Sequence, residues 1–200
     1  MKLTNLLLGL ALAATTMSSA CAQTLPQPQK QGGMPLMQAV NDRMSDRDLN
    51  PNVSITNQDL SNMLWAAWGI THDGKRTVAT ALNKQELDIY VITAKGIGRY
   101  NAEQNAIEEV ASGDFSVLAG TQEFAQKAPL NIAFVANTDK QAQALFQGYA
   151  AGAASQNIYL YCASAGLKTV VRASFKAAEL AAAMKLGANQ KILFVQSVSH

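Results

Sequence analysis

The chain has 200 residues with 16 basic and 14 acidic side chains, so its formal net charge is only +2. Phosphate backbones are bound by clustered cations, so this charge balance argues against a nucleic-acid partner. The length suits one domain with a sizeable core, and no internal repeat is visible.

Residues 1–22 have the pattern of a secretory signal peptide. Lys2 supplies a basic start, residues 6–14 an apolar core, and Ala20-Cys21-Ala22 a small-residue cleavage site. The apolar run is too short to cross a bilayer, which takes about 20 residues. We therefore expect an exported, periplasmic protein with no transmembrane segment in its mature chain. Cys21 leaves a second possibility open, a lipoprotein acylated at that cysteine.

Residues 23–36 are rich in glutamine, proline and glycine, which is typical of a flexible linker. A single domain is expected to follow over residues 37–200. Its first stretch, residues 37–47, is weakly helical.

The clearest helix comes next. Thr56 and Asp59 form a capping-box pattern, an apolar stripe starts at Leu60, and Gly69 ends the helix. The hydrophobic pattern then predicts a strand at 87–94, a hairpin of strands 97–100 and 106–110, a helix at 115–126 and a buried strand at 130–136.

The segment 141–167 contains no charged residue. A helix without a charged face is usually buried on all sides. Two interpretations are open. The helix lies in a subunit interface, where Gly148 and Gly152 would permit close helix approach, or it is a single central core helix. A strand at 169–173, a helix at 177–185 and a strand at 191–198 follow. Together the elements indicate an α+β fold with helices around a mixed β-sheet.

Two arginines and a serine lie close together in the segment 43–47. On a helix, Arg43 and Arg47 would share one face. With the Ser45 hydroxyl they can clamp a phosphate through charge-assisted hydrogen bonds. The alternative is an exposed helix end whose arginines are neutralised by three neighbouring aspartates.

A polar turn precedes the strand at 87–94. Its Thr80, Asn83 and Gln85 carry hydroxyl and amide groups, which suit a site that holds a flat, polar-edged ring by hydrogen bonds. On its own, such a segment is more often an ordinary turn.

Together, the segment 43–47 and this turn resemble the FMN-dependent nitroreductase family, in particular its SagB-type branch of thiazole/oxazole oxidase-like proteins. The resemblance extends from Met37 to Val198. It implies a nitroreductase-like three-layer sandwich and a homodimer that binds FMN between its subunits. Because the flavin carries the redox chemistry, no catalytic side chain is expected.

The resemblance also gives roles to individual residues. Arg43, Ser45 and Arg47 match the pattern that holds the FMN phosphate and ribityl chain. Many relatives have further basic residues near the C-terminus. This chain reaches His200 without them, so the phosphate is expected to depend mostly on the two arginines.

The other cofactor-binding residues that the resemblance implies are Thr80, Asn83, Gln85, Gln122, Arg172 and Ala173. In the ring-binding turn, Ala79 replaces the family's proline and Thr80 its serine, so the turn lacks a fixed φ. The backbone around Arg172 would face the flavin ring. The Arg172 side chain could equally belong to the surface of a strand.

Other chemistry is not indicated. His72 and His200 are the only histidines, and neither has the spacing of a zinc ligand. Cys162 lies in an apolar helix and is expected to be an inert buried thiol. It is the only cysteine once Cys21 is removed or acylated, which excludes an intramolecular disulfide.

We therefore expect an exported FMN-dependent oxidoreductase that passes electrons from a small-molecule donor to a small organic acceptor in a ping-pong cycle. A SagB-type relative can run the reverse sense and oxidise a substrate such as an azoline ring. The alternative is an envelope binding or structural protein that keeps the fold and has lost flavin chemistry.

Overall fold

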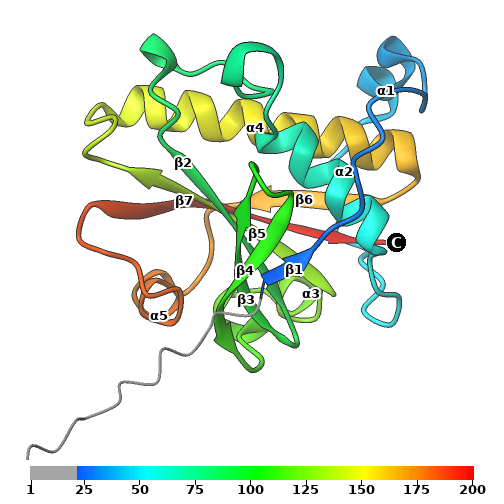
Figure 1. The fold of residues 1–200 in the computed structure, drawn as a ribbon. Helices are drawn as coiled ribbons and strands as arrows, with labels where there is room; N and C mark the ends of the chain where they lie inside the picture. Colours follow the sequence, from blue (N-terminus) through cyan, green and yellow to red (C-terminus); the bar gives the residue numbers. More distant parts are fainter. Residues whose placement is uncertain (1–21) are drawn as a thin grey trace, which may run out of the picture.

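A seven-stranded sheet forms the centre of the computed structural model, which describes residues 22–200 (Figure 1). Its strands are β1 (Ala22–Thr24), β2 (Leu87–Thr93), β3 (Gly96–Asn101), β4 (Ala106–Ser112), β5 (Leu130–Asn137), β6 (Lys168–Arg172) and β7 (Gln190–Ser199). They lie in the order β1-β4-β3-β2-β5-β7-β6.

Every neighbouring pair of these strands is antiparallel. The α+β class is confirmed, but the expected mixed sheet is wrong. The reason is the position of β7. It lies between β5 and β6, which run in the same direction but do not pair.

Helices cover both faces of the sheet and complete the three-layer sandwich. On one face lie α1 (Leu36–Asp42), α2 (Asn57–Trp68) and α4 (Ala144–Ala165), and on the other α3 (Glu123–Gln126) and α5 (Ala177–Ala183) (Figure 1). The core on the α2–α4 side includes Leu64, Ile89 and Phe134. The core on the opposite side includes Val135 and Leu180.

The start and end signals of α2 are confirmed. Thr56 Oγ1 accepts a hydrogen bond from the Asp59 N–H at 3.0 Å, and the helix ends at Gly69, whose N–H donates to the Trp65 carbonyl at 2.8 Å. The predicted strands, including the hairpin, are confirmed with small shifts at their ends.

The flexible linker predicted at residues 23–36 is wrong. β1 pairs with β4, and Leu25 beyond it is only 3% exposed in the core. Farther along, the Met34 N–H donates to Ser164 Oγ at 2.8 Å. The polar composition hid one buried leucine and several backbone contacts. The predicted signal peptide lies outside the described residues except for Ala22, which begins β1.

The helix predicted at 115–126 is also wrong in extent. A 3-10 turn at Ser116–Leu118 and the short α3 replace it. They are separated at Gly120, where a Cβ would lie 3.1 Å from the guanidinium carbon of Arg172. The break therefore falls at a glycine that packs closely against Ala125 and the buried Arg172 side chain.

One side of α4 is open to solvent. Leu145 is 76% and Tyr149 56% exposed, whereas Ala150 and Ala154 on the inner side are buried. The alternative of a helix buried all round in the core of one chain is thus contradicted. Among the helices of residues 22–200, none is long and apolar enough to span a membrane.

Candidate functional site

The segment after α1 carries the two predicted arginines, but it is not helical. α1 ends at Asp42, and Arg43 follows with extended backbone at φ −57° and ψ 122°. The expectation that Arg43 and Arg47 share a helix face is therefore wrong. Instead the segment runs alongside β6, where the Asp46 N–H donates to the Thr169 carbonyl at 3.0 Å.

Tyr159 of α4 ties this segment to the sheet. Its hydroxyl lies 2.7 Å from Ser45 Oγ and accepts from the Val171 N–H at 2.9 Å. The Arg43 guanidinium lies 5.3 Å from the centroid of the Tyr159 ring. We call Arg43, Ser45, Arg47 and Tyr159 the arginine cluster. Sequence reasoning missed Tyr159, although a buried phenol in an uncharged helix usually needs a hydrogen-bond partner.

The arginines of the cluster are not neutralised by the neighbouring aspartates. Within residues 22–200 the ion pairs are Arg99–Glu108, Lys127–Glu123 and Lys168–Asp48. The Asp46 carboxylate accepts from the Asp48 N–H at 2.8 Å. The helix end of that alternative is contradicted, and neither guanidinium group forms an ion pair with a neighbouring aspartate.

Arg172 ends β6, and its side chain turns into the protein. It is 9% exposed and donates to Asn131 Oδ1 at 2.7 Å, to Ser197 Oγ and to the Ala119 carbonyl. Burial lowers the pKa of Arg172 to about 10. The surface position considered for this side chain is therefore wrong. It joins β5, β6 and β7, which leaves only the Arg172 backbone as a candidate contact.

Ala173 and Ser174 follow as exposed residues, and Gln122 comes from the segment beside them. The Thr121 N–H donates to the Ser174 carbonyl at 3.4 Å, and Gln122 is the exposed N-cap of α3. Val171, which contacts Tyr159, is two positions before Ala173. The structure thus brings Gln122 and Ala173 to the β6 end beside the arginine cluster.

The second predicted group forms a compact turn, residues 80–85, which we call the Gln85 turn. Thr80 Oγ1 accepts from the Gln85 N–H at 3.1 Å, and Gln85 Nε2 donates to Asn83 Oδ1 at 3.3 Å. Gln85 Oε1 also accepts from Arg76 Nε at 2.9 Å. The three predicted side chains are brought together, but that of Gln85 is already hydrogen-bonded, whereas Asn83 is exposed.

The backbone of this turn is strained. Leu82, Asn83 and Gln85 have φ values of 54°, 53° and 48°, in the left-handed region. Outside glycine, this conformation costs about 1 kcal/mol or more per residue. Leu82 also has an apolar side chain that is 90% exposed. Backbone strain is often found at ligand and partner contacts, so this turn is a candidate contact site.

The arginine cluster and the Gln85 turn lie toward opposite ends of α4 (Figure 1). The turn is near the start of the helix, since Lys140 Nζ donates to the Gln85 carbonyl at 3.3 Å. The cluster contacts Tyr159, and α4 from Ala144 to Tyr159 is about 22 Å long. One chain therefore does not bring the two groups together.

Comparisons with known proteins assign the fold to a family. The family model described as "Nitroreductase family" matches residues 40–200. The chain belongs to the nitroreductase family. A crystal structure of a candidate nitroreductase from Ralstonia eutropha JMP134 has a TM-score of 0.83 at 33% identity, and the match covers 98% of this chain and 95% of that chain. As expected from the sequence, the protein is an oxidoreductase.

Two further solved structures share the nitroreductase fold at lower identity. One is a candidate nitroreductase from Desulfovibrio desulfuricans in complex with FMN, with TM-score 0.63, 20% identity, and coverage of 84% of this chain and 87% of that chain. The other belongs to the McbBCD microcin synthetase complex of E. coli with truncated pro-MccB17 bound. Its TM-score is 0.68 at 14% identity, and the match covers 98% of this chain and 84% of that chain.

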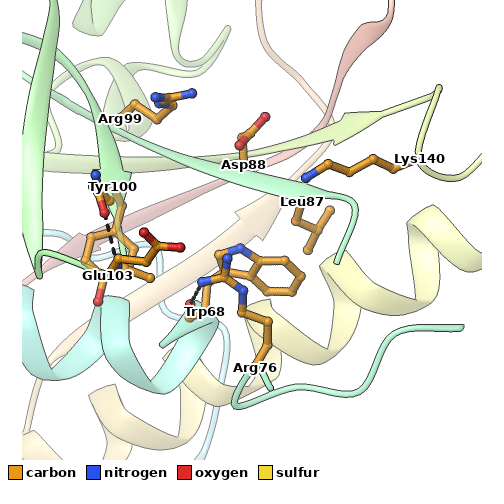
Figure 2. A pocket seen from close by; sticks show the side chains of 10 residues that line it. Trp68, Arg76, Leu87, Asp88, Arg99, Tyr100, Glu103 and Lys140 are labelled. Atoms are coloured by element: carbon orange, nitrogen blue, oxygen red, sulfur yellow. Dashed lines mark hydrogen bonds between the residues drawn. The ribbon is translucent and has the colours of Figure 1, made fainter. Parts of the chain in front are cut away.

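Two hollows lie near the predicted groups of this nitroreductase-family protein. The smaller, about 170 Å³, adjoins the arginine cluster and is lined by Met44 and Tyr159 among others. The larger, about 290 Å³, lies beside Arg76 (Figure 2). Neither is lined by Asn83 or Ala173, so the predicted contacts are not enclosed in one cavity of a single chain.

The remaining reactive groups do not form a site. Cys162 is 1% exposed, and burial raises the pKa of its thiol, which confirms an inert buried cysteine. His72 lies exposed in a loop. Within residues 22–200, no group of histidine, cysteine and acidic residues could hold a metal ion.

Proposed function

We propose that this nitroreductase-family protein binds FMN between two copies of the chain and passes electrons from a small-molecule donor to a small organic acceptor. The observation that carries the proposal is the separation of the arginine cluster from the Gln85 turn, about 22 Å along α4. A twofold arrangement around α4 would set the turn of one copy beside the cluster of the other.

The side chains of the arginine cluster suit the phosphate end of FMN. Arg43 and Arg47 have no carboxylate partner among the described residues, and the Ser45 hydroxyl lies between them in sequence. Guanidinium groups bind phosphate through charge-assisted, often bidentate hydrogen bonds. When bound, FMN supplies the redox chemistry, and the protein holds and orients it.

The end of β6 suits the ring. Ala173 is exposed and lies two residues beyond Val171, which is bonded to Tyr159 of the arginine cluster. Backbone N–H groups at this position can donate to the polar edge of a bound ring. Gln122, from the neighbouring segment, and Asn83, from the second copy, would complete the polar contacts.

An exposed apolar surface supports the dimer. It comprises Leu36, Met37, Val40 and Met44 near α1, and Leu82, Leu145 and Tyr149 near the start of α4. A Cβ at Gly148 or Gly152 would meet no atom within 4 Å, so the outer side of α4 is open to a close neighbour. Exposed apolar side chains at both ends of α4 would be buried if a second copy of the chain packed along this helix.

The experiment that tests the function is visible absorbance of the purified mature protein in the flavin bands, followed by titration with FMN. We expect a flavin spectrum or uptake of added FMN. A colourless protein that takes up no FMN would contradict the proposal. Reduction of the bound flavin by a donor, followed by reoxidation by an acceptor, would establish the ping-pong cycle.

A second candidate function is an envelope binding or structural protein that keeps the fold without flavin chemistry. One observation favours it, because the Gln85 amide is already occupied by Arg76 and by the Gly74 carbonyl. This function predicts that the dimer forms and that FMN does not bind. The same absorbance measurement, combined with sedimentation, separates the two functions.

We also propose that the protein belongs to the SagB-type branch, which would let it oxidise azoline-type rings as well as reduce acceptors. Its similarity in fold to a chain of the McbBCD synthetase complex supports this assignment. A loaded protein that reduces acceptors but never oxidises an azoline substrate would place it outside that branch.

Export to the periplasm, with Cys21 as a possible lipid attachment site, is part of the proposal. It rests on the pattern of residues 1–22. The intact mass of the protein recovered from a bacterial envelope tests it. A mature chain that starts at Gln23 indicates plain cleavage, an acylated Cys21 indicates a lipoprotein, and an uncleaved chain contradicts export.

A further inference from the structure

A cleft of about 290 Å³ lies where β2 and β3 separate, and nothing in the proposed flavin site uses it (Figure 2). The two strands pair only from Tyr90–Arg99 to Thr93–Gly96, although β2 starts at Leu87. The first residues of β2 therefore have no partner on the β3 side. The volume is near the lower end of the range for small-ligand pockets.

Two cations on one wall of the cleft are held in place by the same residue. Arg76 Nε donates to Gln85 Oε1 at 2.9 Å, and Lys140 Nζ donates to the Gln85 carbonyl at 3.3 Å. Arg76 is also fixed over the Trp68 ring, 5.2 Å from its centroid. Within residues 22–200 neither cation forms an ion pair. They are thus preorganised for a carboxylate.

Two acidic side chains also line the cleft. Asp88 extends from β2, and its carboxylate accepts from Gln190 Nε2 at 3.2 Å. Glu103 lies in the turn after β3 and points toward Arg76 across the cleft (Figure 2). Neither carboxylate forms an ion pair among the described residues. Glu103 and Arg76 face each other across the cleft without forming an ion pair, which leaves room for a ligand that carries both charges.

The floor of the cleft is apolar. Trp68, Leu87 and Tyr100 are buried side chains whose surfaces reach it. Desolvation by burial lowers the pKa of Arg76, while Glu103 and Asp88 act in the opposite direction. The charged groups therefore sit at the edge of a partly dehydrated surface, where electrostatic contacts are stronger than in water.

We propose that this cleft binds a small zwitterion of the α-amino-acid type with an apolar side chain. Its carboxylate contacts Arg76 and Lys140, its ammonium group faces Glu103, and its side chain covers the floor. A simple anion would leave Glu103 without a positively charged partner, and a simple cation would leave Arg76 and Lys140 without a negatively charged one. Only a ligand with both charges provides a partner for the two cations and for the Glu103 carboxylate.

Calorimetric titration of the purified protein with three matched probes tests this site. The probes are L-leucine, L-leucinamide, which lacks the carboxylate, and 4-methylpentanoate, which lacks the ammonium group. We expect L-leucine to bind about tenfold more tightly than either analogue, since each loses one charged contact. Equal binding of L-leucine and one analogue, or no binding of L-leucine, would overturn the proposal.

Two variants place the binding in this cleft. Glu103→Gln removes one acid from an exposed turn without changing its shape, and we expect it to weaken L-leucine binding about tenfold. The matched control is Glu109→Gln on β4, which is exposed and outside the cleft, and should leave binding unchanged. L-leucine binding that responds equally to both variants, or to neither, would show that the ligand binds elsewhere.

Discussion

The arginine cluster and the Gln85 turn differ in how their polar groups are satisfied. In the cluster, Arg43 and Arg47 have no carboxylate partner within the described residues. In the turn, Gln85 is hydrogen-bonded to Thr80, Asn83 and Arg76. The guanidinium groups of the cluster can therefore bind a ligand, whereas the Gln85 side chain of the turn already forms hydrogen bonds within the protein.

This difference separates two kinds of residue within one family pattern. Arg43 and Arg47 can be removed with little cost to the fold, because the only side-chain contact described for them is that of Arg43 with the Tyr159 ring. Residues that hold a strained turn cost stability when they are removed, because their partners are left unsatisfied. We therefore expect substitutions in the cluster to change FMN affinity and substitutions in the turn to change folding.

The largest expected effect is on FMN binding by the double variant Arg43→Ala/Arg47→Ala. Loss of two charge-assisted hydrogen bonds to the phosphate should weaken binding at least a hundredfold, about 3 kcal/mol. Titration with FMN, followed by flavin fluorescence, measures it. Because the Arg43 guanidinium also contacts the Tyr159 ring, denaturant unfolding should show a stability loss of at most about 1 kcal/mol.

The matched control for this pair is Lys95→Ala/Lys191→Ala, which removes two exposed cations from other strands and turns. The control variant should bind FMN as the parent protein does. If both double variants weaken binding alike, general electrostatic attraction explains the effect, and the phosphate does not contact the arginine cluster.

A change in the Gln85 turn should affect stability more than affinity. Gln85→Ala leaves Arg76 Nε and the Gly74 carbonyl without their partner. The free energy of unfolding should fall by about 1–3 kcal/mol. Gln85→Glu, which keeps an acceptor for Arg76, should recover part of the loss. If Gln85→Ala instead leaves unfolding unchanged and abolishes FMN binding, the side chain contacts the cofactor directly.

Tyr159 tests the junction between the arginine cluster and β6. Tyr159→Phe removes the hydroxyl that serves both Ser45 and the Val171 N–H. We expect a loss of about 1 kcal/mol in the free energy of unfolding and weaker FMN binding of several-fold. Tyr149→Phe, on the exposed side of the same helix, is the control for monomer stability. If Tyr159→Phe and Tyr149→Phe change stability and FMN affinity equally, the Tyr159 hydroxyl does not position the arginine cluster.

Much of the fold could be predicted from local pattern. The capping box of Thr56 and Asp59, the uncharged α4 and the alternating strands carry signals within a few residues of each other, and the structure confirms them. Sheet order could not be predicted in this way. The position of β7 between β5 and β6 depends on contacts between distant parts of the chain.

The candidate site was predicted as a set of residues but not as a geometry. The pattern at 43–47 indicated a helix, yet the backbone leaves α1 at Arg43 and runs alongside β6, where the Asp46 N–H donates to the Thr169 carbonyl. Arg172 looked like a site or surface residue, since nothing nearby in sequence reveals its buried partners Asn131 and Ser197. Such partners belong to other strands, and residue type alone does not identify them.

The smallest expected effect concerns Leu82, which is strained and exposed in the Gln85 turn. Leu82→Gly relieves a left-handed backbone, so monomer stability should rise by up to about 1 kcal/mol, less the entropy that glycine adds to the unfolded chain. Leu82→Ala keeps the strain and should show no such gain. If Leu82 lies in the proposed dimer interface, both variants should dimerise more weakly in sedimentation experiments, because both remove apolar contact area. If both variants dimerise as the parent protein does, Leu82 lies outside the interface. If Leu82→Gly destabilises the monomer, the turn does not store strain.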